Sequence, residues 1–204
     1  MTAATTAQAE GWLQPVERSD HPFPYFLSDK CLPQALEAAL LNWFETEAPW
    51  RLVETDFYEQ YEFSLLGVPL PSRLEAIASP SFLQAYVRAV EEAFGVALYD
   101  KFSLVAHKLV PGQRIAIHND HLPGGETHRL TIQLNRGLTD KDGGFFMLFN
   151  SFDPADVHRI LRPRSGSGLG FEIGPNSYHA VSRLHGSERY TLVFSFDAQP
   201  SALA

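Results

Sequence analysis

The amino-acid sequence predicts an α+β protein that is mainly β, a jelly roll with helices on its N-terminal side. Three observations support this class. Two segments of helical periodicity come first, and from Leu98 onward short apolar runs alternate with turn signals. The 204 residues, of which 45% are hydrophobic, are enough for one globular domain with a real core.

Two helices are expected in the first half of the chain. Residues 32–48 place apolar side chains at helical spacing, and Pro33 is tolerated in the first turn of that segment. Residues 80–94 repeat the pattern, with Ser79 as the N-cap and Pro80 at the first helical position. The aromatic and β-branched stretch 51–66 between them predicts one or two strands. We expect both helices to cover one outer face of a sheet.

The second half predicts eight short strands in a row, which favours a jelly roll. They are expected near residues 102–110, 113–118, 128–135, 144–149, 158–161, 167–173, 178–184 and 189–197. The sequence thus predicts a single domain over residues 1–204. Within it we expect a loose tail (1–20), a helical support region (21–97), a β core (98–197) and a C-terminal tail (198–204).

Composition excludes several classes of partner. The formal net charge of −8 argues against nucleic acid. No apolar run is long enough for a membrane span, and the first residues lack the pattern of a secretion signal. Cys31 is the only cysteine, so no internal disulfide forms, and we interpret it as a small core residue. A reducing, cytoplasmic location follows as an expectation, and the oligomeric state stays open.

His118, Asp120 and His179 form the candidate metal site. His118 ends a predicted strand, and strand alternation would turn Asp120 to the same side, away from Ile115 and Ile117. His179 opens the penultimate strand. Two imidazoles and one carboxylate on one face of an ion leave open positions opposite, which suits ferrous iron. An H-x-D pair alone is weak, so the order of strands around it carries the prediction, and His121 is the substitute ligand.

Arg189 is the candidate anchor for an anion. It opens the clearest strand, in which Arg189, Thr191, Val193 and Ser195 share one face. A buried guanidinium needs an anionic partner and grips a carboxylate through two parallel hydrogen bonds. The alternative is an exposed arginine paired with Glu188.

Several motifs together resemble the 2-oxoglutarate and Fe(II)-dependent oxygenase superfamily, above all its prolyl-4-hydroxylase-like branch. The matching pieces are Val110-Pro111-Gly112, His118-Asn119-Asp120, the run from Arg129 to Asn135, Asp142-Gly143-Gly144-Phe145-Phe146, Tyr178-His179-Ala180-Val181 and Glu188-Arg189-Tyr190. The resemblance covers about the last half of the chain, and the combination is more specific than any single piece.

The resemblance implies a double-stranded β-helix with Fe(II) held by His118, Asp120 and His179. It implies 2-oxoglutarate as cosubstrate on Arg189, dioxygen as the oxidant source, and ascorbate as a candidate auxiliary reductant. Thr191 adds a hydroxyl beside Arg189. Many prolyl hydroxylases carry a tyrosine before the H-x-D, which the stretch 106–110 lacks, so Thr131 and Gln133 are candidates to supply the missing contact.

The implied activity is hydroxylation of an amino-acid side chain in a peptide or protein, of a free amino acid, or of a small metabolite. Asp120 argues against the halogenating branches, which replace this carboxylate, and the acidic charge argues against the DNA-repair branch. The loop 119–127 is a candidate lid. Residues 58–63 line a substrate cleft or pack as ordinary sheet. The alternatives are a cupin-like metalloprotein that does not use 2-oxoglutarate, and an interaction module that has lost its chemistry.

Overall fold

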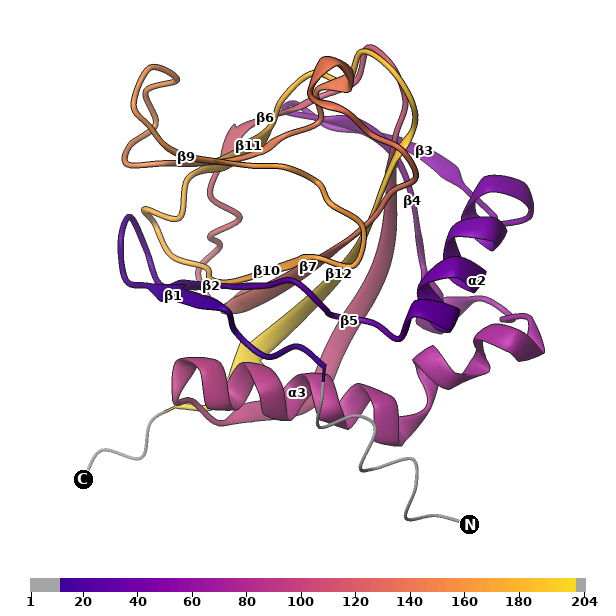
Figure 1. Ribbon diagram of the computed structural model, residues 1–204. Helices are drawn as coiled ribbons and strands as arrows, with labels where there is room; N and C mark the ends of the chain where they lie inside the picture. Colours follow the sequence, from indigo (N-terminus) through magenta and orange to yellow (C-terminus); the bar gives the residue numbers. More distant parts are fainter. Residues whose placement is uncertain (1–11, 201–204) are drawn as a thin grey trace.

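Two sheets face each other in the computed structural model, which describes residues 12–200 (Figure 1). The order of the eight-stranded major sheet is β1(Glu17–Ser19), β2(Tyr25–Ser28), β10(Gly168–Glu172), β7(His128–Leu134), β12(Arg189–Ala198), β5(Leu98–Leu109), β4(Glu59–Ser64) and β3(Arg51–Glu54). The order of the minor sheet is β6(Ile115–His118), β11(His179–Val181), β8(Phe146–Phe149) and β9(Val157–Leu161). All pairings between neighbouring strands are antiparallel.

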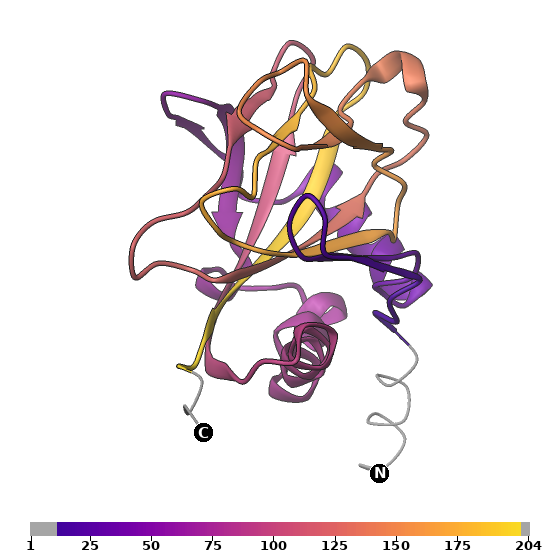
Figure 2. The ribbon, with the colours of Figure 1, turned by 90° about the vertical axis from the view of Figure 1, so that its left-hand side faces the viewer.

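This arrangement is a double-stranded β-helix, which confirms the expected fold class. All eight strands predicted after Leu98 are present, and their bounds differ from the expected ones by a few residues. The largest extension is at β5, which starts at Leu98 because it pairs along nearly the whole length of β12. Figure 2 shows the two sheets from the side, with the helices below the major sheet.

The helices α2(Gln34–Thr46) and α3(Pro80–Phe94) cover the outer face of the major sheet, as expected. Ser79 caps α3 and accepts a hydrogen bond from the backbone N–H of Phe82. Tyr86 of α3 stacks on Phe194 of β12 with ring centroids 4.8 Å apart. Apolar side chains of both helices and of β12 therefore form one core, which fixes β12 from outside the barrel.

The helical region carries structure that the sequence did not predict. Pro33 is the N-cap of α2 and does not lie in its first turn. The short 3₁₀ helices η1(Leu65–Gly67) and η2(Ser72–Ala78) also lie in this region. A further 3₁₀ helix, η3(Asp140–Asp142), lies between β7 and β8. Burial of Leu74 and Ile77 under α2 and α3 explains why η2 forms in a proline-bounded stretch.

The expected N-terminal tail is wrong in its bounds. Residues 17–19 form β1, and the region 21–97 adds β2, β3 and β4 to the major sheet. A three-residue strand has too few positions to show alternation, so only its partner β2 makes it a strand. At the other end β12 continues to Ala198. The rest of the tail prediction falls on residues 1–11 and 201–204, which lie outside the described residues.

Two smaller expectations are also tested. Cys31 is a free thiol with no exposed surface, which confirms its interpretation as a core residue. Within residues 12–200, no helix is long and apolar enough to span a membrane.

Candidate metal and anion site

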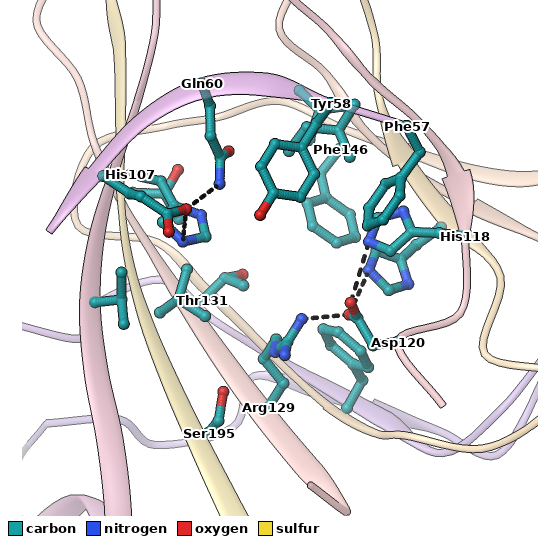
Figure 3. A pocket seen from close by; sticks show the side chains of 18 of the residues that line it. Phe57, Tyr58, Gln60, His107, His118, Asp120, Arg129, Thr131, Phe146 and Ser195 are labelled. Atoms are coloured by element: carbon teal, nitrogen blue, oxygen red, sulfur yellow. Dashed lines mark hydrogen bonds and ion pairs between the residues drawn. The ribbon is translucent and has the colours of Figure 1, made fainter. Parts of the chain in front are cut away.

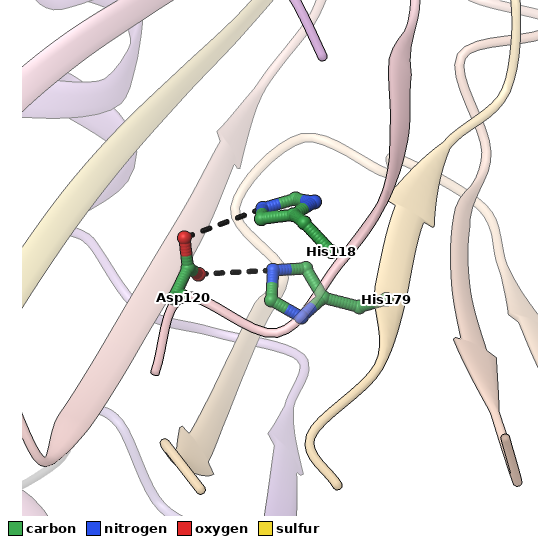
Figure 4. Close-up of side chains that lie close together, drawn as sticks. All are labelled: His118, Asp120 and His179. Carbon is green, nitrogen blue, oxygen red and sulfur yellow. Dashed lines mark ion pairs between the residues drawn. The ribbon is translucent and has the colours of Figure 1, made fainter. Parts of the chain in front are cut away.

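His118 at the end of β6, Asp120 just after it and His179 at the start of β11 come together (Figure 4). Their candidate ligand atoms all lie within 4.8 Å of one another. The Nε2 atom of His118 lies 3.3 Å from Oδ1 of Asp120, and Nε2 of His179 lies 3.1 Å from its Oδ2. The sequence-predicted triad is therefore brought together with three side chains aimed at one point.

The strands place the two histidines side by side, but alternation is not what places Asp120. His118 on β6 is the register partner of His179 on β11. The strand ends at His118, and Asp120 adopts a left-handed backbone with φ 59°. Asparagine and aspartate tolerate this conformation better than most residues. The positive φ turns the carboxylate back toward the imidazoles.

The expectation that Ile115 packs on the face opposite His118 is wrong. Ile115 and His118 line the same cavity. The register between β6 and β11 shifts between His118 and Ile115, because Ala116 and Ile117 of β6 lie opposite the single residue Ala180 of β11. Such a bulge changes which side chains share a face.

Backbone carbonyls orient both imidazoles. Nδ1 of His118 lies 2.9 Å from the carbonyl oxygen of Ala116, and Nδ1 of His179 lies 2.7 Å from that of Ser177. A carbonyl only accepts, so each Nδ1 donates, and each Nε2 keeps its lone pair for an ion. This donor set fits a divalent metal, since both nitrogens are free and the third ligand is a carboxylate.

Electrostatics hold the ligands in the protonation states that a metal needs. Burial opposes ionisation of Asp120, but the two imidazoles beside it and the nearby charge of Arg129 hold the pKa of its carboxyl well below the usual range. Burial, reinforced by His118, lowers the pKa of His179. The carboxylate is therefore charged and His179 is neutral at pH 7.

His121, the substitute ligand, does not join the cluster. It is exposed and lines an outer cavity. Asn119 instead links the two ligand-bearing segments: its Nδ2 donates to the carbonyl of Pro175, and its own carbonyl accepts from Ser177.

Arg189 is buried and lines the same cavity as the triad, a space of about 290 Å³. Its Nη1 donates to Oγ1 of Thr191 at 2.9 Å, while Nε and Nη2 have no hydrogen-bond partner. Burial lowers the pKa of the guanidinium to about 10. The alternative pairing with Glu188 is wrong, because Glu188 contacts Lys108 and Tyr190.

The predicted alternation along β12 is confirmed. Arg189, Thr191, Val193 and Ser195 all line the inner cavity. The side chains between them pack into the core beneath the helices. Thr131 also lines the cavity, from β7. Gln133 lies behind Thr191, whose hydroxyl it accepts at 3.3 Å, and it lines a separate cavity on the far side of Phe146.

The structure adds polar residues that the sequence did not single out. Gln60, Glu62 and His107 form a cluster on the cavity wall. Figure 3 shows Gln60 and His107 across the cavity from His118 and Asp120. Gln60 donates to Glu62 at 2.9 Å, and Nε2 of His107 lies 3.7 Å from the same carboxylate. Burial, reinforced by two arginines, lowers the pKa of His107 to about 3, so it is neutral at pH 7. The stretch 58–63 thus lines the cavity.

Arg129 is the other residue that was missed. It donates to Asp120 through Nη1 and to Glu126 through Nη2 at 2.6 Å. It shares a strand face with Thr131, so alternation from the predicted Thr131 would have found it.

Comparison with known proteins shows the same fold in several oxygenases. No family model matches the chain, and no curated protein matches it significantly. A prolyl-4-hydroxylase from Pseudomonas putida superposes with a TM-score of 0.68 at 16% identity, covering 96% of this chain and 99% of that one.

Two further solved structures are similar. A prolyl hydroxylase from Trichoplax adhaerens, in complex with a peptide fragment of the hypoxia inducible factor oxygen degradation domain, has a TM-score of 0.65 at 10% identity, covering 85% and 83%. A viral collagen prolyl hydroxylase from Paramecium Bursaria Chlorella virus-1, in a 2OG complex, has a TM-score of 0.60 at 14% identity, covering 84% and 94%. At these identities the likeness shows a shared fold.

Proposed function

We propose that this chain is an Fe(II)- and 2-oxoglutarate-dependent oxygenase that hydroxylates an unactivated C–H bond. One observation carries the proposal. A His-Asp-His cluster and a buried arginine with two unpaired N–H donors line the same cavity. A metal site alone would suit many reactions, but the unpaired guanidinium calls for an anionic cosubstrate beside it.

His118, Asp120 and His179 would hold the iron, and Arg189 would bind the distal carboxylate of 2-oxoglutarate. Thr191 holds Nη1 of Arg189 and leaves Nε and Nη2 free for that carboxylate. Gln133 acts through Thr191. Ferrous iron with 2-oxoglutarate and dioxygen supplies the oxidising power for such a hydroxylation.

The chain itself binds and orients the reactants and keeps water away. Phe146 stacks on His179 with an interplanar angle of 8°, and Phe171 meets the same imidazole edge-on. Phe57 lies against His118 with ring centroids 4.7 Å apart. These aromatic rings fix the imidazole planes and form an apolar wall around the ligand atoms.

The substrate is an amino-acid side chain in a peptide or protein, a free amino acid, or a small metabolite. The peptide complex of the Trichoplax neighbour supports a peptide. We place the enzyme in the cytoplasm, where a reducing environment keeps iron ferrous.

Succinate formation from 2-oxoglutarate tests the proposal directly. Purified protein with Fe(II) and oxygen should convert 2-oxoglutarate to succinate, and omission of iron should stop it. His118→Ala should lose both iron binding and turnover, while His185→Ala, on a turn outside the cluster, serves as the control. Tight iron binding without any succinate would favour the cupin-like alternative. Absence of tight metal binding would favour the other alternative, an interaction module that has lost its chemistry.

A further inference from the structure

The inner cavity, which the triad and Arg189 line, shares part of its wall with a larger outer cavity of about 780 Å³. Five residues line both cavities: Phe57, His118, Asp120, Glu126 and Arg129. The metal ligands and the Arg129–Glu126 ion pair thus lie at the boundary between them. With the cosubstrate in the inner cavity, a molecule in the outer one would reach the metal past this ion pair.

Arg129 contacts two carboxylates, and of these only Glu126 can be replaced by another anion. Asp120 accepts from Nη1, and this carboxylate is the candidate metal ligand. A bound divalent ion would share the charge of Asp120, which leaves Arg129 more dependent on its second partner. That partner is Glu126, on the loop between β6 and β7.

Glu126 satisfies Arg129 incompletely. It accepts a hydrogen bond from Nη2 only, and Nε of Arg129 is buried without a partner. The Glu126 side chain is 39% exposed, so solvent weakens its attraction to the more buried Arg129. A carboxylate aligned along the edge of the guanidinium would bind Nε and Nη2 together, one bond more than Glu126 makes.

The rest of the outer cavity is apolar at its rim. Leu122 and Phe152 are 71% and 64% exposed, and Phe57 is 37% exposed. Tyr178 meets Phe152 edge-on, with ring centroids 5.7 Å apart. Among the described residues that line this cavity, Arg129 is the only lysine or arginine. An occupant that matches the cavity is therefore apolar with one negative charge.

We propose that Arg129 anchors the carboxylate of the primary substrate, a small acid with an apolar body, in the place that Glu126 otherwise occupies. This inference rests on the proposed function and narrows its substrate class. His118 and Asp120 line the outer cavity beside Arg129, so an acid anchored there presents its body to the metal ligands. Between turnovers, Glu126 takes the place of the substrate carboxylate and keeps the Arg129 guanidinium paired.

Binding of a matched pair of probes to the metal-free, full-length protein tests this. The probes are 3-phenylpropanoate and its neutral analogue 3-phenylpropanamide, measured by calorimetric titration. The acid should bind at least about tenfold more tightly than the amide. Arg129→Gln should remove that difference. Glu126→Gln should tighten the acid severalfold and leave the amide unchanged, because the competing carboxylate is gone.

Two control variants separate this site from other arginines. Arg189→Gln removes the proposed cosubstrate anchor, and Arg136→Gln removes an exposed arginine that pairs with Glu45. Both should keep the preference for the acid. Loss of the preference in Arg189→Gln, or equal binding of acid and amide to wild type and Glu126→Gln, would overturn the proposal. Absence of acid binding to both proteins would do the same.

The binding experiment and the succinate assay can fail independently of each other. Should Arg129→Gln fail to fold, Glu126→Gln alone decides, because its side chain lies on a partly exposed loop. Arg129-dependent acid binding without succinate formation would overturn the oxygenase and leave the acid anchor standing. Succinate formation without any preference for the acid would overturn only the anchor.

Discussion

Replacing Arg189 by methionine should make the metal-free protein more stable and weaken binding of the proposed cosubstrate. The guanidinium is buried with two unpaired donors, and its pKa is about 10 where 12.5 is usual. That difference corresponds to a penalty of about 3 kcal/mol for the buried charge. The lost hydrogen bond to Thr191 offsets about 1 kcal/mol of the gain. We expect a net stabilisation of about 2 kcal/mol from an apolar side chain of similar length.

The same variant should bind 2-oxoglutarate poorly. Two hydrogen bonds from a charged donor to a carboxylate are worth about 3 kcal/mol at the low end, or about a 100-fold change in affinity. Arg189→Lys keeps the charge but not the paired donors, so it should fall between the two. Urea unfolding at pH 7 measures the stability, and the KM for 2-oxoglutarate in succinate formation measures the anchor.

Two results would refute this reasoning. Destabilisation by Arg189→Met would mean that the guanidinium has a partner in the native protein. An unchanged KM would mean that another group holds the cosubstrate. Arg183→Met is the control, since Arg183 contacts the carbonyl of Gly112 outside the cavity.

Three further predictions concern the fold. Burial lowers the pKa of His128 to about 4, so near pH 6.5 the unfolded chain takes up a proton at this residue and the folded protein does not. The free energy of unfolding should therefore fall by about 2 kcal/mol between pH 7 and pH 5. Urea unfolding at these two pH values measures the fall, and His128→Phe should remove this part of it. Ser79→Ala should cost about 1 kcal/mol in the same assay, because α3 loses its cap; no change would show that the cap is dispensable. Gly170→Ala should cost at least about 2 kcal/mol, because its methyl group would overlap the Phe26 ring, and a wild-type melting temperature would contradict that packing.

Much of the fold was predictable because turn residues separate the core strands at short intervals. Pro111-Gly112 lies in the connection between β5 and β6, and Gly174-Pro175 lies in the connection between β10 and β11. β1 lies at one edge of the major sheet, where pairing with β2 alone makes a strand of a segment too short to show alternation. β3 and β4 lie in the stretch 51–66, where aromatic and β-branched residues predicted one or two strands, and the structure confirms that prediction.

The metal ligands were predictable from residue type and order, and their geometry was not. Alternation would place Asp120 beside His118 only if the strand continued, and it ends at His118. Glu62 was missed for a different reason. A polar side chain on a strand faces either solvent or an interior cavity, and only the pairing of the sheets decides which.

Strand β12 sets what can vary in this protein. One face carries the proposed cosubstrate anchor and the other is locked under two helices, so mutations along it would change foldability and chemistry together. Residues at the rim of the outer cavity do not combine a role in folding with a role in the chemistry. Leu122 and Phe152 sit on connecting segments, where an altered side chain leaves both sheets intact. Substitutions at the outer rim should therefore change which molecule binds there, while the candidate metal site stays the same.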